Sequence, residues 1–209
     1  MEIDAERLEN LNMNMIVYSR LSKAVDYPDE ELVEGLLQGE YVPSLPYETA
    51  ERMKAYMDAF DSADELLLDL QKEYTRMCFV SKPRLVPLFE SVYKEGKLFQ
   101  DSTFQIARLY DEAGIKLGQN FNLPPDHITL ELEFMSYLIY QEMEAVKNEN
   151  EINEAMALRL QNEIINKHLS HFALSLAERL AEHATTPFYQ GIGEILRDLF
   201  QFEIQQEQN

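Results

Sequence analysis

The architecture of this chain depends on residues 120–140, NFNLPPDHITLELEFMSYLIY, where a proline-rich break directly precedes a markedly apolar segment. Apolar residues after Pro125 occupy one helical face and much of the rest, so we expect a central helix over about 126–147. Glu131 and Glu133 are two positions apart and point in nearly opposite directions, about 200° apart at 100° per residue. At least one of these two carboxylates must then be partly enclosed by protein.

Helical patterns fill most of the remaining sequence. There are only seven glycines and eight prolines among the 209 residues, and we find no strand-like alternation of useful length. Boundary signals include Pro28 with the acids after it, Gly39 at the end of that segment, and Ser62 with Glu65, which are spaced as a capping box. We expect helices at 4–27, 28–38, 47–60, 62–80, 102–116, 126–147, 151–183 and 187–205.

Residues 81–102, SKPRLVPLFESVYKEGKLFQDS, interrupt this pattern with two prolines and a glycine. The segment still carries many large apolar side chains, and exposing all of them would be unfavourable at ~25 cal/mol per Å² of apolar surface. We therefore expect an ordered connector. The predicted fold class is all-α, a helical bundle of two packed halves joined by a hinge loop. The N-terminal half is 1–118 with the connector 81–102, the hinge is 119–125, and the C-terminal half is 126–209.

Composition excludes several classes of function. Lys and Arg number 18 against 38 Asp and Glu, a formal charge of -20, which disfavours binding to nucleic acid and to anionic membrane surfaces. No apolar run approaches the ~20 residues that span a bilayer, and the acidic N-terminus is unlike a secretory signal. Cys78 is the only cysteine, so no intramolecular disulfide is possible, and its apolar surroundings predict a buried structural thiol. We expect a cytoplasmic protein without stable membrane insertion.

The start of the central helix allows two interpretations. His127 lies four residues before Glu131, the spacing at which side chains on a helix touch. In the structural interpretation, Asp126 caps the helix or complements its positive end, and His127 satisfies Glu131. In the functional interpretation, the hinge exposes Asp126 and His127 at the mouth of a groove, where they accept a positively charged group. Spacing alone favours the structural interpretation.

Four sequence motifs, in order, resemble the TorD/DmsD/NarJ family of chaperones that mature molybdenum-containing redox enzymes. The strongest is PPDHITLELEFM, residues 124–135, which is similar to the Pro-Asp-His hinge motif of the family. EYTRMCF at 73–79 and PLFESVYKEGKLF at 87–99 resemble two further family segments. NKHLSHFALSLAERL together with FYQGIGEIL resembles the late helices.

This resemblance implies a non-enzymatic function: binding the twin-arginine signal peptide and the apoprotein of a molybdoenzyme catalytic subunit before export. Arginine offers forked donors that Asp126 and Glu131 accept, and an acidic chain attracts such a peptide. Aromatic residues of the connector, including Phe99, would help to line an apolar groove. The signal-peptide-binding residues that the resemblance implies are Arg76, Phe89, Glu90, Ser91, Tyr93, Pro125, Asp126, His127 and Glu131.

Other classes of function remain open at this point. A helical-bundle metal protein would use His168 and His171, three residues apart, or His127 with Glu131, but the paired Glu-x-x-His motifs of carboxylate-bridged iron are absent from the sequence. An oligomeric scaffold is the third class, and a homodimer that exchanges helical halves is conceivable. We expect no resident cofactor. Weak guanine-nucleotide binding is suggested by the family resemblance alone, and no phosphate-cradling glycine loop supports it.

Overall fold

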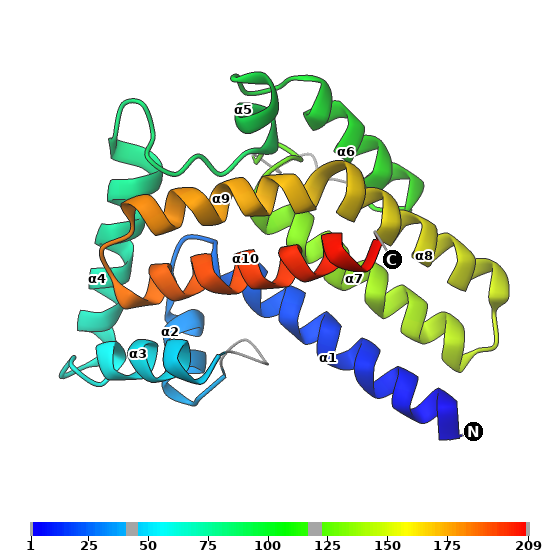
Figure 1. Cartoon of the computed structure of the whole chain (residues 1–209), viewed down its shortest axis with the longest axis horizontal. Helices are drawn as coiled ribbons and strands as arrows, with labels where there is room; N and C mark the ends of the chain where they lie inside the picture. The colour runs from blue at the N-terminus through cyan, green and yellow to red at the C-terminus, as the bar shows by residue number, and fades with distance from the viewer. Residues whose placement is uncertain (1, 41–45, 117–122, 208–209) are drawn as a thin grey trace. The chain divides into compact units, whose positions relative to one another are not determined.

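The computed structural model describes residues 2–40, 46–116 and 123–207, which are helical apart from loops and an isolated β-bridge (Figure 1). The expected all-α class is confirmed, and each predicted helix is present with its ends displaced by a few residues. The helices are α1 (Glu2–Ala24), α2 (Glu30–Leu37), α3 (Tyr47–Met57), α4 (Ala63–Thr75), α5 (Glu90–Glu95), α6 (Asp101–Glu112), α7 (Ile128–Lys147), α8 (Glu151–Ile164), α9 (Ser170–His183) and α10 (Pro187–Glu207).

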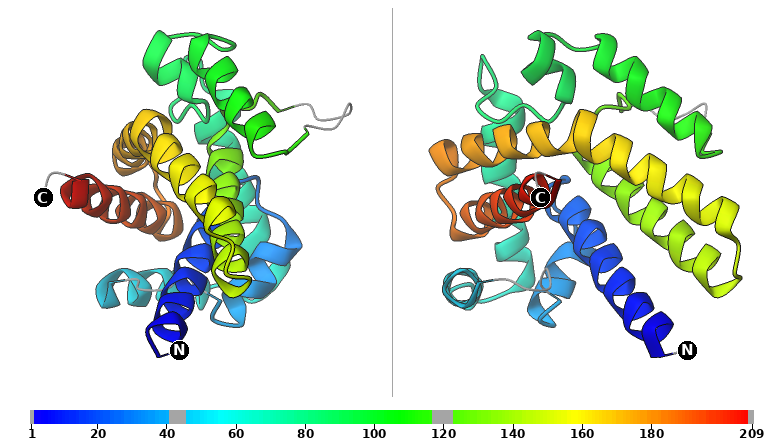
Figure 2. Two further views of the ribbon diagram at one scale, coloured as in Figure 1. Left: turned by 90° about the vertical axis from the view of Figure 1, so that its right-hand side faces the viewer. Right: turned by 45° about the vertical axis from the view of Figure 1, so that its right-hand side comes forward.

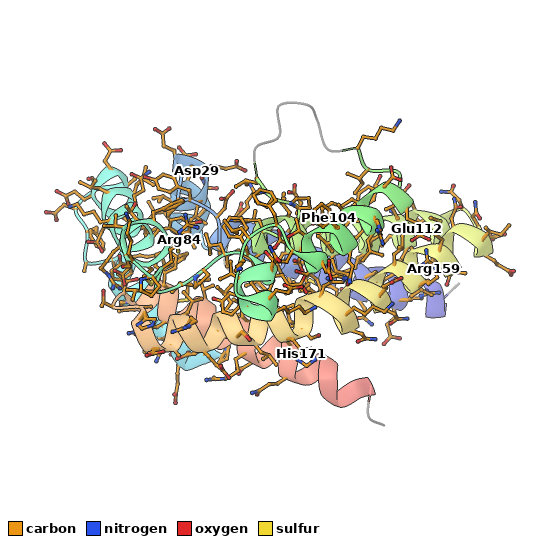
Figure 3. All side chains as sticks on the ribbon, turned by 90° about the horizontal axis from the view of Figure 1, so that it is seen from above. Asp29, Arg84, Phe104, Glu112, Arg159 and His171 are labelled. Carbon is orange, nitrogen blue, oxygen red and sulfur yellow. The ribbon has the colours of Figure 1, made fainter. Side chains whose placement is uncertain are left out.

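Two of the predicted helices contain π-helical turns that periodicity did not indicate. The turn η1 (Arg76–Val80) follows α4 directly, and η2 (Ile165–Leu169) joins α8 to α9 within the segment expected as one helix at 151–183. A π-turn adds a residue to the helical repeat and redirects the side chains that follow it. His168 lies in η2 and is buried, whereas His171, labelled in Figure 3, is exposed.

The boundary signals read from the sequence are largely confirmed. Asp29 caps α2 by accepting the Leu32 N–H at 2.9 Å, and Gly39 lies past its end with a φ of 79°. Ser62 caps α4 by accepting the Glu65 N–H at 3.3 Å. The return bond of the capping box differs from expectation, because the Glu65 carboxylate accepts the N–H of Asp61, one residue before the cap.

Residue contacts divide the chain into two compact units, each built from separate parts of the sequence. Unit 1 is Met1–Ser22 with Phe89–His171, and unit 2 is Lys23–Leu88 with Phe172–Asn209. The predicted halves, 1–118 and 126–209, follow the chain consecutively and differ from these units. The predicted hinge at 119–125 lies mostly in 117–122, outside the described residues. The division into consecutive halves therefore stays a prediction.

In unit 1, α7 is the central helix, as its sequence predicted. The helix α8 returns alongside it, as both views of the hairpin show (Figures 1 and 2). The helix α1 runs antiparallel to α7, because the Ser22 hydroxyl donates to the Thr129 carbonyl at 2.9 Å and Ser136 donates to the Met15 carbonyl at 3.0 Å. Glu112 and Arg159, both labelled in Figure 3, form an ion pair that joins α6 to α8.

In unit 2, α4 packs against α2, and α10 packs against α3. The buried ring of Tyr74 lies between Tyr27, at 5.6 Å between centroids, and Tyr189, at 6.2 Å. Gly191 allows α3 and α10 to approach closely, because a Cβ there would lie 2.6 Å from the Met53 sulfur. Cys78 is buried as expected, and burial raises the pKa of its thiol to about 12, which makes it a poor nucleophile.

The predicted connector at 81–102 is ordered, as expected, but it contains the short helix α5. Val86, Leu88 and Phe89 are buried, whereas Leu98 and Phe99 are exposed. This agrees with the expectation that the apolar residues of the connector are not all exposed, and the exposed Phe99 has a φ of 59°. The buried apolar residues of the connector all precede α5.

Candidate functional site

The Pro-Asp-His segment of unit 1 is fastened to the start of α5. Phe89 and His127 form the isolated β-bridge, and their rings meet edge to face with centroids 5.0 Å apart. Asp126 accepts two backbone N–H groups at 2.9 Å each: its carbonyl accepts from Glu90, and its Oδ2 accepts from Ser91. The family-like motifs around residues 89–91 and 124–127 therefore form one structural element.

The cap of α7 differs from the structural interpretation of the sequence. His127 is the N-cap, and its Nδ1 accepts the Thr129 N–H at 3.3 Å. Asp126 contacts the start of α5 and does not cap α7. No hydrogen bond links His127 to Glu131, because both carboxylate oxygens of Glu131 lack hydrogen-bond partners among the described residues. The predicted contact between His127 and Glu131 is therefore not formed as a hydrogen bond, because the imidazole accepts from the backbone at the N-terminus of α7.

Burial also corrects the functional interpretation, which expected Asp126 and His127 to be exposed at the mouth of a groove. Asp126 is 0% exposed and His127 is 3% exposed. Of the two central glutamates, Glu131 is fully buried and Glu133 is exposed, which confirms the argument that at least one is enclosed. A ligand that reaches these groups must enter the interior of unit 1.

Glu90, Asp126 and Glu131 are fully buried. The Glu90 N–H donates to the Asp126 carbonyl at 2.9 Å, and Glu131 lies in the first turn of α7 just after Asp126, so we call these three residues the carboxylate cluster. Glu90 has two positively charged or protonatable partners. His168 Nδ1–H donates to its Oε2 at 2.9 Å, and the Lys94 ammonium lies 2.5 Å from its Oε1. Lys94 comes from α5 itself, one turn after Glu90, and His168 comes from η2. The cluster thus brings together α5, the Pro-Asp-His segment, α7 and η2.

Glu131 is the least satisfied member of this carboxylate cluster. Burial raises the pKa of its carboxyl group well above the ordinary range, and repulsion by Glu90 and Asp126 raises it further, while Lys94 opposes the shift. Within the described part of the chain, Asp126 Oδ1 and the Ser91 hydroxyl also lack partners. An unsatisfied buried polar group costs about 1–3 kcal/mol, so such a concentration calls for a functional explanation.

The remaining predicted residues occupy different surroundings. The Pro125 carbonyl accepts a 2.9 Å hydrogen bond from the Tyr110 hydroxyl, whose pKa is raised by burial and then by Glu131. Tyr93 lies on α5 and is half-buried. Arg76 belongs to unit 2, where its guanidinium binds Glu73 and the His183 carbonyl. Phe89, Glu90, Ser91, Pro125, Asp126, His127 and Glu131 are thus grouped, and Arg76 is not one of this group.

Two members of the site, Lys94 and His168, were not predicted. The i,i+4 spacing of Glu90 and Lys94 was an available signal, but α5 itself was not predicted as a helix. His168 is 78 residues from Glu90 in sequence, and no local pattern connects them. Among the described residues, no group of three His, Cys, Asp or Glu side chains is arranged to hold a metal ion. No helix in the described ranges is long and apolar enough to cross a bilayer.

Comparison with known proteins gives the family. Residues 43–178, nearly two thirds of the chain, match the family described as the nitrate reductase delta subunit. The chain belongs to the nitrate reductase delta subunit family. This membership confirms the resemblance to TorD-type redox-enzyme maturation chaperones that the four motifs indicated. The family is one of cytoplasmic chaperones and not of catalysts.

Individual relatives agree with this assignment. The chaperone protein TorD of Vibrio cholerae, in strains O395 and M66-2, is 28% identical over 108 residues, which are 51% of this chain and 48% of the relative. The chain spans about half the length of the curated relatives it matches. A crystal structure of a candidate redox enzyme maturation protein from Archaeoglobus fulgidus shares the fold, with a TM-score of 0.59 and 22% identity, over 90% of this chain and 93% of that one.

Proposed function

We propose that this chain binds the twin-arginine signal peptide and the apoprotein of a molybdenum-containing oxidoreductase in the cytoplasm and holds them until the cofactor has been inserted. Family membership supports the class of function. The observation that carries the proposal for the site is the set of buried carboxylate oxygens without donors beside the Pro-Asp-His segment, at Asp126 Oδ1 and on Glu131. These oxygens are unsatisfied acceptors, and arginine is a donor-only side chain.

Arginine suits this site better than other side chains. Its guanidinium presents five N–H donors in a planar fork and stays charged at all physiological pH values, so it can satisfy two carboxylates at once. The formal charge of -20 on the chain adds a long-range attraction for a basic peptide. Both properties favour a positively charged peptide over nucleic acid or an anionic metabolite.

The proposal is tested by calorimetric titration with a synthetic peptide that carries two consecutive arginines. A second peptide has glutamine at both positions, and we expect it to bind at least tenfold more weakly. Asp126→Asn is the informative variant, because asparagine keeps an oxygen acceptor for the Ser91 N–H while it removes the charge. It should weaken binding of the arginine peptide about tenfold, the effect of losing one charge-assisted hydrogen bond.

The matched control is Asp111→Asn, an exposed aspartate on α6, which should leave the affinity unchanged. Equal affinity of the Asp126→Asn variant and the control for the arginine peptide would contradict the site assignment. Capture of the tagged chain from its own host, with mass spectrometry of co-purifying polypeptides, tests the client. Recovery of a molybdoenzyme subunit with its leader supports the proposal. Homodimerisation by exchange of helical halves stays a prediction, which size-exclusion chromatography tests.

A further inference from the structure

The carboxylate cluster already contains one positively charged side chain, and that side chain reaches the surface. Lys94 is 33% exposed, yet its ammonium lies 2.5 Å from Oε1 of Glu90, which is 0% exposed. Its ammonium also donates to the Lys167 carbonyl. Lys94 therefore reaches from solvent to the buried carboxylates and marks the side from which a cation can approach them.

Glu131 provides the second observation. It is fully buried, and neither of its oxygens has a hydrogen-bond partner in the described part of the chain, although it lies near Glu90 and Asp126. Three adjacent carboxylates cannot all be ionised at low cost with one ammonium beside them. Burial and repulsion raise the pKa of Glu131, so its proton compensates for the missing positive charge.

We propose that the cluster is a receptor for one cationic side chain of the ligand, and that the arriving cation releases the proton of Glu131 to solvent while Lys94 keeps its contact with Glu90. This inference rests on the proposed function and adds to it the exchange of a proton for the guanidinium of an arginine. The charge balance is closed: one positive charge enters the cluster, one proton leaves it, and the Lys94 ammonium stays beside Glu90, so three carboxylates then share two cations.

A guanidinium makes this exchange favourable for two reasons. It supplies donors to the oxygens of Glu131 and to Asp126 Oδ1, which lack them, and its charge stabilises the Glu131 carboxylate once the proton has left. Other titratable groups must be considered as the source of the proton. The groups that surround Glu131 and its cluster are Glu90 and Lys94 from α5, Tyr110 from α6, Asp126 and His127 from the segment before α7, and His168 from η2.

Calorimetry in two buffers of different ionisation enthalpy counts the protons released when the two-arginine peptide binds. The wild-type chain should release close to one proton at neutral pH. Glu131→Gln should release none, because the glutamine has no proton to exchange. The association constant of the wild type should rise with pH, by up to about tenfold per unit while a full proton is released, and this slope should disappear in Glu131→Gln. Glu133→Gln, the exposed neighbour on α7, serves as control and should behave as wild type.

The outcomes separate this inference from the proposed function. Binding with the same proton release in wild type and Glu131→Gln overturns the inference, leaves the proposed function standing, and indicates a different source of the proton. Absence of any binding by the wild type overturns both. Proton release that is lost only in Glu131→Gln supports both.

Lys94→Met tests whether the retained ammonium is needed, because methionine keeps much of the apolar stem and removes the charge. We expect this variant to release clearly less than one proton when the two-arginine peptide binds, since a single guanidinium then faces three carboxylates. The exposed Lys97→Met is the control and should release as much as wild type. Full proton release by the Lys94 variant would overturn the role given to Lys94.

Discussion

Glu73 in unit 2 and Glu131 in unit 1 are both buried glutamates on helices, but their carboxylates have opposite surroundings. The oxygens of Glu73 accept from Arg76 Nε at 2.7 Å and from a terminal guanidinium nitrogen of Arg76 at 2.8 Å. They also accept from the Thr185 N–H at 2.6 Å and from its hydroxyl at 2.8 Å. Glu131 has no such donor among the described residues.

The pKa values of the two carboxyl groups reflect this difference. Burial acts to raise both, but the hydrogen bonds from Arg76 and Thr185 outweigh it and lower the pKa of Glu73. At Glu131 burial is unopposed except by Lys94, and the pKa is raised well above the ordinary range. Burial alone therefore does not determine whether a carboxyl group is ionised, because the donors around it decide the direction of its pKa shift. A complete set of donors makes Glu73 structural, whereas Glu131 has no donor among the described residues, which is why we propose a ligand for it.

Glu73→Gln is the substitution with the largest expected effect on stability. It removes the charge that Arg76 and Thr185 share and places an amide N–H₂ among donors. We expect a loss of about 3 kcal/mol in the free energy of unfolding, measured by denaturant titration at neutral pH. Glu178→Gln, an exposed change on α9 of the same unit, should cost less than about 0.5 kcal/mol. If Glu73→Gln and Glu178→Gln lowered the free energy of unfolding equally, the hydrogen bonds of Glu73 would not stabilise the fold, and Glu73 would no longer differ from Glu131 in this respect.

Glu131→Gln should instead change how stability depends on pH. Because the pKa of Glu131 is raised in the folded state, the wild-type chain loses stability as pH rises from its unfolded value of about 4.3 toward the folded value. The variant lacks this loss and should gain relative to wild type by up to about 1.4 kcal/mol per pH unit in that window. Denaturant titrations between pH 4 and 8 measure the difference. A constant difference across this range would contradict a protonated Glu131.

Arg7→Met tests whether Glu73 and Glu131 differ because of their hydrogen-bond donors or because they lie in different units. The test uses a third buried glutamate, Glu142. Glu142 lies in unit 1 and is buried, but it accepts from Arg7 at 2.7 Å and from Gln161 at 2.9 Å. Since Arg7 is 38% exposed and Gln161 remains, we expect a loss of only about 0.5–1 kcal/mol. Lys147→Met, which breaks an exposed pair with Glu144, is the control with an expected loss near zero. A loss as large as that of Glu73→Gln would contradict this ranking.

Local signals in the sequence were sufficient for most of the secondary structure. Helix periodicity together with caps such as Asp29 and Ser62 gave the helices, because these signals act within a few residues. The π-turns η1 and η2 were missed because an inserted residue leaves no mark in composition. The helix α5 was missed because six residues are too few to show a period.

Residues of the candidate site could be predicted only where they belong to a sequence motif or to a helical spacing. The enclosure of Glu131 followed from the angle between it and Glu133. The fastening of Asp126 to Ser91 joins residues 35 positions apart, and the Glu90–His168 contact joins residues 78 apart, so neither could be derived from one sequence. The exposure expected for Asp126 and His127 was wrong because their partners lie in such distant segments.

The interleaved composition of the two units has a consequence for synthesis. All segments of unit 1 have been made once residue 171 is translated, whereas unit 2 still lacks α10 and most of α9. Glu73 gains Arg76 three residues later but receives Thr185 only 112 residues after itself, an interval on the order of ten seconds at ribosomal speed. During that interval the α2–α4 region of unit 2 emerges before the helices that complete its interior. During its own synthesis, the chain therefore exposes part of the unit 2 interior until α9 and α10 have been made.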